Sequence, residues 1–473
     1  MLGISGTTLP VPGEKTLVVP LGGCEGIGMN ATLYGARGKW LLADAGCAFP
    51  DENLHPEIER VMLHPGLLLG LGTDLVGLVV THAHEDHVGA IPFLWPPLKA
   101  PIHATPFAAR LIRDRLAERG TEGRVELIEH STSDRLRIGP FDVRIIPAAH
   151  SIPEATMLAI RSEEGLILHT GDWKLDAEPL VGERTELAEL TQLSAAEGFA
   201  LVVCDSTNAA VPGKTPSEAI VETAMGVLLD GWPGAAVVAC FSSNVARIKA
   251  IALAAEANGR KTCLCGRSLV RIERCAREAG FLNGVPEFID VAEAAALPRK
   301  AKLILCAGTQ GEKNSAMTKI IEGTHPRFRI MPDDLAVWSA RRIPGNEERV
   351  EETQRRAKSI GAKVITPDDG PIHVSGHPAR DDVAKLLIAA APKSVLPTHG
   401  GREQIAAMAS LAEALGMRVP VIARDGDALR LDADGPTKIA SVGRTLLGLS
   451  EKKLIPFDDD PWRRAITARP RAT

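Results

Sequence analysis

Short apolar runs separated by turns fill the first part of the chain, up to about residue 205. Runs of this length, bounded by Gly, Pro and Asp, are typical of β-strands. They stand at residues 15–23, 39–46, 75–84, 101–106, 141–150, 166–173 and 201–207. A helical spacing of apolar residues is clear chiefly over 106–119. This part therefore predicts a β-rich domain with few helices.

After about residue 210 the pattern changes to buried strands that alternate with amphipathic helices. Three strand–helix pairs follow one another, with helices predicted over 244–258, 268–279 and 314–322. Such repetition favours a parallel sheet that carries helices on its faces. After about residue 358, strand-like stretches return, as in "AKVITP" (362–367). We therefore expect a first domain over 1–212, an inserted domain over 213–358, a returning part over 359–440, and a basic tail over 441–473.

Composition narrows the class of protein. The chain has 473 residues, of which 45% are hydrophobic and 24% charged, as in ordinary globular proteins. Its net charge of −5 argues against general coating of nucleic acid but allows a local basic channel. No apolar run approaches the roughly 18–20 residues that span a bilayer, and the start resembles no signal peptide. Eight cysteines without a CxxC pair indicate buried reduced thiols, so we expect a cytoplasmic protein with no membrane contact.

The candidate chemistry begins at "THAHEDH" (81–87), which follows the apolar run "LVGLVV" (75–80). His82, His84, Asp86 and His87 crowd the end of a predicted buried strand. Imidazole and carboxylate ligands without thiolate suit Zn²⁺, and also Mn²⁺ or Fe. A polar surface loop is the alternative for one HxH pair, but this density of ligands after a buried strand favours a metal site.

Three further residues close apolar strands in the same way. They are His150 after "VRIIPAA", Asp172 after "LILHTG" and His399 after "SVLPT". Each alone is more often a hydrogen-bonded surface residue. Together they bring the candidate ligands to seven, which is enough for two metal ions that share one carboxylate.

These stretches resemble a known motif series. "THAHEDH", His150, Asp172 and His399, with Asp44 in "LLADAG", resemble the motifs of the metallo-β-lactamase fold. Asp205 in "CDST" and the stretch "HVSGH" (373–377) resemble the β-CASP nucleases. "HTGDWK" (169–174), "GTQGEKNSAM" (308–317) and "RIPGNE" (342–347) are closer still to the ribonuclease J family, over about residues 15–435. The resemblance implies an α/β fold: a metallo-β-lactamase αββα sandwich with an inserted β-CASP α/β domain.

The resemblance also implies roles for the ligands. One metal takes His82, His84 and His150; the second takes Asp86, His87 and His399; Asp172 bridges the two. It implies two divalent metal ions per chain, with Zn²⁺ expected first and Mn²⁺ second. Two ions roughly 3.5–4 Å apart can activate a water and stabilise an in-line phosphodiester displacement.

On the substrate side, the resemblance makes His377 the residue that contacts the scissile phosphate, with Asp205 orienting it or a ligand histidine. Small polar residues before a helix favour anion binding, and the resemblance implies that Ser242, Ser243 and Asn244 contact an RNA 5′-monophosphate. The rest of the "HVSGH" loop joins them: His373, Val374, Ser375 and Gly376. A turn histidine and a plain helix cap are the alternative readings of His377 and of residues 242–244.

Two other stretches are weaker candidates. The loop "GTQGEKNS" (308–315) can form a second phosphate-facing loop. Arg267, Arg271 and Arg274 lie near one another on a predicted helix, which is more often a solvated face than an RNA contact. From the resemblance we also expect the family's C-terminal domain to be absent, so a homodimer is left open.

The prediction is a metal-dependent ribonuclease that acts in RNA processing and decay. The resemblance implies 5′→3′ exonuclease activity on single-stranded RNA with a 5′-monophosphate, and leaves endonuclease activity open. His399 favours the RNA-processing branch, because the DNA-repair branch usually has valine there. The alternatives are an RNA-binding or nuclease-partner subunit with weak activity, a DNA-acting β-CASP nuclease, and a small-molecule hydrolase.

Overall fold

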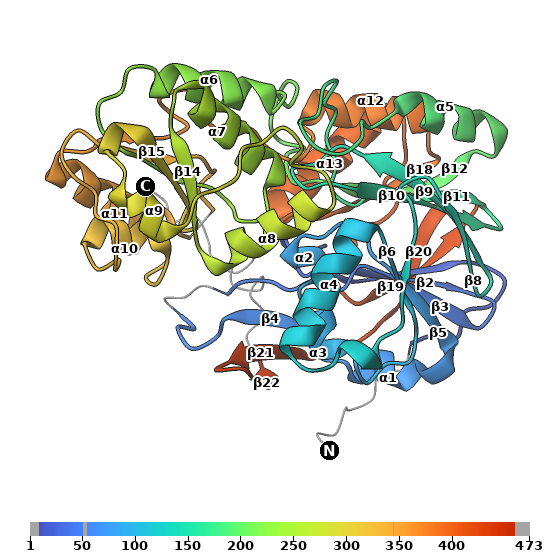
Figure 1. The fold of residues 1–473 in the computed structure, drawn as a ribbon. Coiled ribbons are helices and arrows are strands. Elements are labelled where there is room, and N and C mark those ends of the chain that lie inside the picture. The colour runs from blue at the N-terminus through green and yellow to red at the C-terminus, as the bar shows by residue number, and fades with distance from the viewer. Residues whose placement is uncertain (1–8, 51–53, 344, 459–473) are drawn as a thin grey trace, which may run out of the picture.

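Two β-sheets stacked face to face form the larger unit of the molecule, and a smaller sheet with helices on both faces forms a second unit beside it (Figure 1). The computed structural model describes residues 9–50, 54–343 and 345–458. Each helix in this part of the chain is too short or too polar to span a lipid bilayer.

The first stacked sheet has eight strands in the order β20-β19-β1-β2-β3-β5-β6-β7. In that order they are Gly435–Ser441, Asp427–Asp432, Leu17–Gly22, Ala31–Ala36, Lys39–Ala43, Leu75–Val79, Ile102–Ala104 and Leu127–Glu129. Its outer face carries α1 (Gly66–Leu71), α3 (Ile91–Leu94) and α4 (Pro106–Glu118), as Figure 1 shows. β3, β5, β6 and β7 are parallel, so their carboxyl ends meet at one edge of the sheet.

The second stacked sheet has six strands in the order β18-β12-β11-β10-β9-β8. In that order they are Ser394–Thr398, Phe199–Asp205, Gly165–His169, Ala155–Ser162, Phe141–Ala148 and Arg135–Ile138. Helices α5 (Leu187–Ala196), α12 (Arg380–Ala390) and α13 (Arg402–Ala414) cover its outer face and share an apolar core with it. The two helix-covered sheets confirm the predicted αββα sandwich.

The central strands of both sheets, such as β3 and β12, are buried on both faces. In β3, Leu41 and Ala43 pack between the sheets, while Trp40 and Leu42 pack toward the helices. Successive side chains of a strand point to opposite faces, so a strand covered on both sides reads as a continuous apolar run. The strand ends therefore carry the few polar side chains, at the edge where the helices do not reach.

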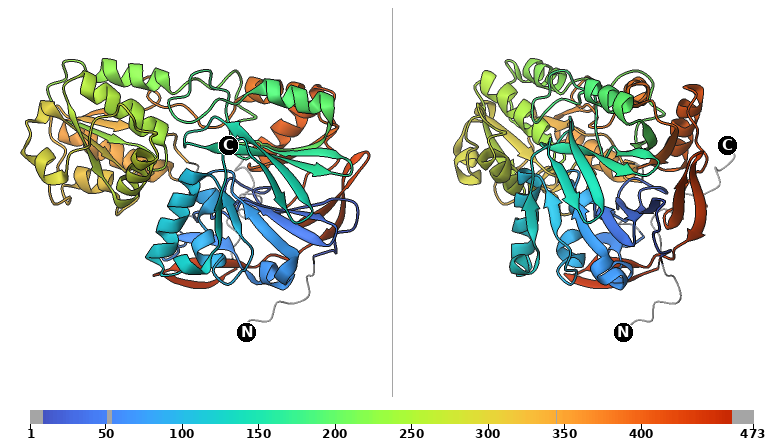
Figure 2. Two further views of the ribbon diagram at one scale, coloured as in Figure 1. Left: turned by 45° about the vertical axis from the view of Figure 1, so that its right-hand side comes forward. Right: turned by 90° about the vertical axis from the view of Figure 1, so that its right-hand side faces the viewer.

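The inserted unit has a five-stranded parallel sheet in the order β14-β15-β13-β16-β17. Its strands are Lys261–Cys265, Lys302–Cys306, Ala236–Ala239, Leu335–Trp338 and Lys363–Ile365. One face packs on α6 (Ala219–Leu229), α7 (Val245–Ala257) and α8 (Arg267–Glu278). The other packs on α9 (Val291–Ala296), α10 (Ala316–Glu322) and α11 (Glu347–Ile360). Figure 2 shows this unit, green through yellow to orange, set beside the stacked sheets.

The inserted sheet extends past the boundary expected at residue 358. That position lies inside α11, and β17 (Lys363–Ile365) pairs with β16 of the inserted sheet. The stretch "AKVITP" therefore belongs to the insert and not to the returning part. The return itself is clear, because β18 pairs in parallel with β12 across the insertion.

The expected tail over 441–473 is wrong for its first part. β21 (Leu446–Ser450) and β22 (Lys453–Phe457) form a three-stranded sheet with β4 (Arg60–Leu63). Leu446 and Phe457 pack there against Met29 and Val61. The arginine-rich remainder, 459–473, lies outside the described residues.

Candidate metal centre and substrate pocket

The candidate ligands follow strand ends at one edge between the two stacked sheets. His82 follows β5, His150 follows β9, Asp172 follows β11 and His399 follows β18. His84 precedes the short helix α2 (Glu85–Val88), which carries Asp86 and His87. The structure brings all seven predicted ligands together, in sets whose ligand atoms lie within 4.8 Å of one another.

In the first set, ring nitrogens of three imidazoles point toward one another. Nδ1 of His84 lies 3.1 Å from Nε2 of His82 and 3.1 Å from Nε2 of His150. A neutral imidazole has one N–H donor and one acceptor nitrogen, so mutual hydrogen bonds cannot satisfy three converging nitrogens at once. A cation can accept all three lone pairs, and with Asp172 the set offers the four ligands of a tetrahedral site. The donors thus fit a divalent metal ion.

The second set joins Asp86, His87, Asp172 and His399. Nε2 of His399 lies 3.1 Å from Oδ2 of Asp86, and Nε2 of His87 lies 3.3 Å from Oδ2 of Asp172. Asp172 belongs to both sets, so its carboxylate is placed to bridge two ions. The sets hold nitrogen and oxygen donors and no thiolate, which suits Zn²⁺ or Mn²⁺.

The protonation states favour ligation in the first set. Burial lowers the pKa of His84 to about 4, and burial together with His87 lowers that of His82 well below the usual range. Burial and His84 do the same for the pKa of His150. Burial would raise the pKa of Asp172, but His399 and His87 hold it well below its usual value. Three neutral imidazoles and an ionised carboxylate are the forms that bind metal.

Asp44 holds one ligand in the orientation that ligation needs. Its Oδ2 lies 2.8 Å from Nδ1 of His87, which leaves Nε2 of His87 to face Asp172. Thr81 donates to both oxygens of Asp44, from its backbone N–H at 2.8 Å and its hydroxyl at 2.7 Å. The Asp44 backbone is left-handed, at φ 60°. A carboxylate behind a ligand histidine fixes its tautomer and raises its basicity.

The segment after Asp44 packs closely on α2. A Cβ at Gly46 would lie 1.6 Å from the carbonyl oxygen of Asp86, so only glycine fits there. Asn30 completes this contact, because its amide nitrogen lies 3.0 Å from Nε2 of His87 and 3.2 Å from the Asp86 carbonyl oxygen. The sequence analysis missed Asn30, a single polar residue in a glycine-rich turn.

The half-buried His377 and the buried Asp205 form a pair beside the candidate metal ligands. Nδ1 of His377 lies 2.8 Å from Oδ2 of Asp205, which ends β12. Thr207 donates to the other carboxylate oxygen, from its backbone N–H at 2.9 Å and its hydroxyl at 2.6 Å. Burial opposes the charge of Asp205, but His377 keeps the pKa of that carboxyl low. The pair leaves Nε2 of His377 for another partner.

The loop that carries His377 contacts His150, a candidate metal ligand. Nδ1 of His150 lies 2.7 Å from the carbonyl oxygen of Gly376, so the ring donates there and turns Nε2 toward His84. A Cβ at residue 376 would lie 2.7 Å from Cε1 of His150. Glycine is therefore required where this loop passes the ring.

The predicted anion site at the start of α7 lies next to the same ligand. Asn244 caps α7, since its side-chain oxygen accepts the Arg247 N–H at 2.8 Å. The Ala246 N–H donates to the carbonyl oxygen of Ser151 at 3.3 Å, one residue after His150. Ser242 and Ser243 are half-buried in the turn before Asn244. The structure thus brings residues 242–244 to the metal-ligand edge.

Arg247, which the sequence analysis missed, ties α7 to the "HVSGH" loop. Its buried guanidinium pairs with Glu218 and donates to the Ser339 carbonyl at 2.7 Å. It also donates to the Val374 carbonyl at 3.1 Å and lies 3.2 Å from Nδ1 of His373. Its position in "NVARI" carried no periodic signal. These bonds join α7, which follows residues 242–244, to the loop 373–376, and we call the two segments together the candidate pocket wall.

The two weaker candidates have structural partners. The loop 308–315 supports a neighbouring segment: the Gln310 amide donates to the Arg341 carbonyl at 3.0 Å and accepts the Ile343 N–H at 2.8 Å. Arg271 and Arg274 of α8 pair with Glu118 and Asp114 of α4. These two arginines therefore join the insert to the sandwich, while Arg267 is exposed at the start of α8.

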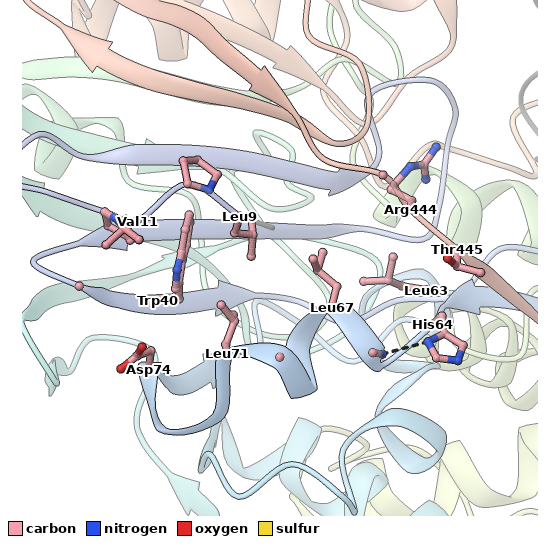
Figure 3. Close-up of a pocket in the computed structure, with 16 residues that line it drawn as sticks. Leu9, Val11, Trp40, Leu63, His64, Leu67, Leu71, Asp74, Arg444 and Thr445 are labelled. Atoms are coloured by element: carbon pink, nitrogen blue, oxygen red, sulfur yellow. Dashed lines mark hydrogen bonds between the residues drawn. The ribbon is translucent and has the colours of Figure 1, made fainter. Parts of the chain in front are cut away.

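A separate pocket of about 240 Å³ lies on the far side of the eight-stranded sheet (Figure 3). Trp40, Leu63, Leu67 and Leu71 line it, and the Gly66 N–H donates to Nδ1 of His64 at 3.0 Å. Over the described residues, its lining holds none of the seven ligands. Its lining mixes apolar side chains with His64, Asp74 and Arg444.

Comparison with known families and proteins matches three separate parts of the chain. Residues 26–199 match the metallo-beta-lactamase superfamily. Residues 234–356 match the beta-CASP domain of ribonuclease J, and residues 371–423 match a Zn-dependent metallo-hydrolase RNA specificity domain. A protein of unknown function from Enterococcus faecalis shares the fold, with a TM-score of 0.60 at 16% identity over 88% of this chain and all of that one.

Curated relatives match along most of their length. Ribonuclease J of Sinorhizobium meliloti is 35% identical over 90% of this chain and 76% of its own. That of Thermus thermophilus is 33% identical over 92% and 77%, and that of Mycobacterium tuberculosis 37% over 86% and 74%. With the fold and the ligand arrangement already described, this similarity shows that the chain belongs to the ribonuclease J family.

Proposed function

We propose that this chain is a metal-dependent ribonuclease that hydrolyses RNA phosphodiesters in RNA processing and decay. The observation that carries the proposal is the pair of ligand sets that share Asp172, with His377 and the pocket wall 373–376 beside them. Family membership supports the same activity, because the relatives are named ribonuclease J.

The metal complement that we propose is two divalent ions, Zn²⁺ first and Mn²⁺ second. His82, His84 and His150 would hold one ion, and Asp86, His87 and His399 the other, with Asp172 between them. When bound, the ions would supply Lewis-acid activation of water and would neutralise charge on the scissile phosphate.

His377 and Asp205 are placed to act on the leaving oxygen of the reaction. Asp205 accepts from Nδ1 of His377, so the His377 ring is fixed and its Nε2 can donate to a phosphate or leaving oxygen. Gly376 fixes the distance between this ring and His150. His377 thus acts on the substrate, and Asp205 positions it.

The direction of attack that we propose is 5′→3′, with removal of mononucleotides from RNA that carries a 5′-monophosphate, because the resemblance to ribonuclease J implies it. In the loop 373–377, Ser375 accepts from Asn208 and His377 lies beside Asp172. Endonuclease activity is a second mode to be measured.

The test uses 5′-labelled, 5′-monophosphorylated single-stranded RNA with Zn²⁺ or Mn²⁺. Labelled mononucleotides are expected from the wild type. Asp172→Ala should lose metal and all cleavage, whereas His377→Ala should keep its metal and cleave slowly. Intact RNA in every metal condition, with bound metal demonstrated, would reject the proposal. Competition with a matched DNA oligonucleotide separates the ribonuclease from a DNA-acting enzyme.

Location and assembly are further parts of the proposal. All eight cysteines are free and buried, which fits a reducing compartment such as the cytoplasm. A homodimer stays a prediction, and sedimentation of the purified protein measures it directly.

A further inference from the structure

Helix α2 carries Asp86 and His87, two ligands of the second set, yet it is a single turn. A helix this short gains too few internal hydrogen bonds to be stable alone. Its first residue, Glu85, is held through the backbone, because its carbonyl oxygen accepts the Cys47 N–H at 3.1 Å. The orientation of both ligands therefore depends on what else holds this turn.

Two arginines hold the carboxylate of Glu85. Nη1 of Arg60 and Nη1 of Arg115 each donate to its Oε2 at 2.8 Å. Nη2 of Arg115 contacts the other oxygen, Oε1, so this guanidinium binds the carboxylate through both ends of its fork. The exposed fractions of the three side chains are 26% for Arg60, 17% for Arg115 and 27% for Glu85. Charged, bidentate contacts of this kind are among the strongest hydrogen bonds in proteins. We call these three residues the arginine clamp.

The two arginines come from different parts of the fold. Arg60 begins β4 and lies opposite Leu449 of β21 in the three-stranded sheet. Arg115 lies on α4, in the helix layer outside the eight-stranded sheet. Burial, and then Arg60, lowers the pKa of Arg115 to about 10, so its guanidinium stays charged at neutral pH. The arginine clamp thus joins α2 to two separate elements.

The residue at position 89 leaves space for the arginine clamp. A Cβ at Gly89 would lie 2.8 Å from Oε2 of Glu85 and 2.5 Å from Sγ of Cys47. The Gly89 backbone is right-handed helical, so glycine is needed there for space and not for its conformational freedom. The packing around α2 is therefore built around the Glu85 carboxylate.

We propose that Glu85 is a positioning residue, which Arg60 and Arg115 hold so that Asp86 and His87 keep the orientation that the second metal ion requires. This inference rests on the metal centre of the proposed function. Among the described residues, the ligand sets leave Glu85 out, although it stands between two ligands in the chain. Loss of the arginine clamp should weaken the second ion and spare the set of three histidines.

The experiment removes the arginine clamp from the side of α4. Arg115→Gln leaves the balanced pair of Arg60 and Glu85. Arg113→Gln is the matched control, because Arg113 lies two positions away on α4 and pairs with Glu129 in a contact whose side chains are 42% and 41% exposed. Such surface pairs contribute little to stability. Equal thermal melting of the two metal-free variants shows that both fold.

The measurement is competition for Zn²⁺ between the protein and a chelator of known affinity. The wild type and Arg113→Gln should bind two ions with equal affinities. Arg115→Gln should bind the first ion as the wild type does and the second about 10-fold more weakly, the lower end of the range for partners of metal ligands. Unchanged affinity for both ions in Arg115→Gln overturns the inference. An equal loss at both sites also overturns it, since the variant would then have loosened the whole fold.

Glu85→Gln tests the same contact from the other partner. It should weaken the second ion alone, and the double variant with Arg115→Gln should be no weaker than Glu85→Gln, because both changes remove one interaction. Additive losses overturn the inference. If Glu85→Gln fails to fold with two guanidiniums left unbalanced, Arg115→Gln decides by itself. A wild type that binds two Zn²⁺ ions but cleaves no RNA rejects the proposed function and leaves the arginine clamp in place.

Discussion

Nδ1 of His150 lies 2.7 Å from the carbonyl oxygen of Gly376, although the two residues are 226 positions apart in the chain. This bond joins a ligand of the first domain to the loop that follows the insert. It fixes which ring nitrogen of His150 carries the proton, and so leaves Nε2 for the metal. The loop 373–377 and the candidate metal centre are therefore directly connected, and a shift of one should displace the other.

Gly376→Ala should disturb both the loop 373–377 and the candidate metal centre. The added Cβ would lie 2.7 Å from Cε1 of His150, so the ring or the loop must move. We expect metal affinity and cleavage to fall about 10- to 100-fold, as for other partners of metal-ligating histidines. Metal content by mass spectrometry and cleavage rates measure this. Gly370→Ala is the control, because its Cβ would meet nothing within 4 Å; equal behaviour of the two variants would remove the steric argument.

Asp44→Asn should weaken the second ligand set while the fold is kept. The amide can still accept from Thr81, but it no longer offers a carboxylate to Nδ1 of His87. The His87 tautomer and basicity then change, and we expect metal affinity to fall about 10- to 100-fold. Competition with a chelator of known affinity measures the change. Unaltered affinity would show that Asp44 serves the backbone turn alone.

Asp205→Asn should slow cleavage at constant metal content. The carboxylate contacts His377 at 2.8 Å, and its loss frees the ring to rotate. We expect kcat to fall about 10- to 100-fold, within the range for one positioned acid–base group, with KM little changed. Single-turnover kinetics separate this from slow product release. If Asp205→Asn also loses metal, Asp205 acts through His399, from which it lies 3.4 Å away.

His373 should stay neutral through the range where unfolded histidines titrate. Burial, Arg247 and Arg341 lower its pKa to about 3 in the folded chain, against about 6.5 when unfolded. Below about pH 6.5 the His373 ring is protonated in the unfolded chain but stays neutral in the folded chain down to about pH 3. The free energy of unfolding therefore falls as pH drops from about 6.5 toward 3.

NMR of the His373 ring measures this directly. Its resonances should not shift between pH 8 and about 4.5, and Arg341→Gln should raise the pKa because one repelling charge is gone. An ordinary titration near pH 6.5 in the wild type would contradict the buried contact with Arg247.

The family resemblance implied the sandwich, and the strand ends predicted the meeting of the ligands because they carry a strong signal. Polar residues that follow apolar runs, such as His150 and Asp172, must lie at a sheet edge, and parallel strands bring their ends together. Which sheet a strand joins has no such signal. "AKVITP" reads like any edge strand, and only its pairing with β16 places it in the insert.

The sequence pattern also gives no signal for side chains whose partners lie far away along the chain. Arg247 bonds His373 across 126 positions, and an arginine in a helix is usually solvated. Asn30 reaches His87 across 57 positions from a turn that has no periodicity. The strands β21 and β22 were overlooked because basic residues nearby suggested a tail, although Leu446 and Phe457 are buried.

The insertion also determines the order in which the candidate ligands are synthesised. During translation, residues 82–172 leave the ribosome well before residue 399, so a growing chain holds the first four candidate ligand histidines but lacks the last one. It also lacks β19 and β20, which close the sheet beside β1. The second ligand set would then be complete only after residue 399 has been synthesised.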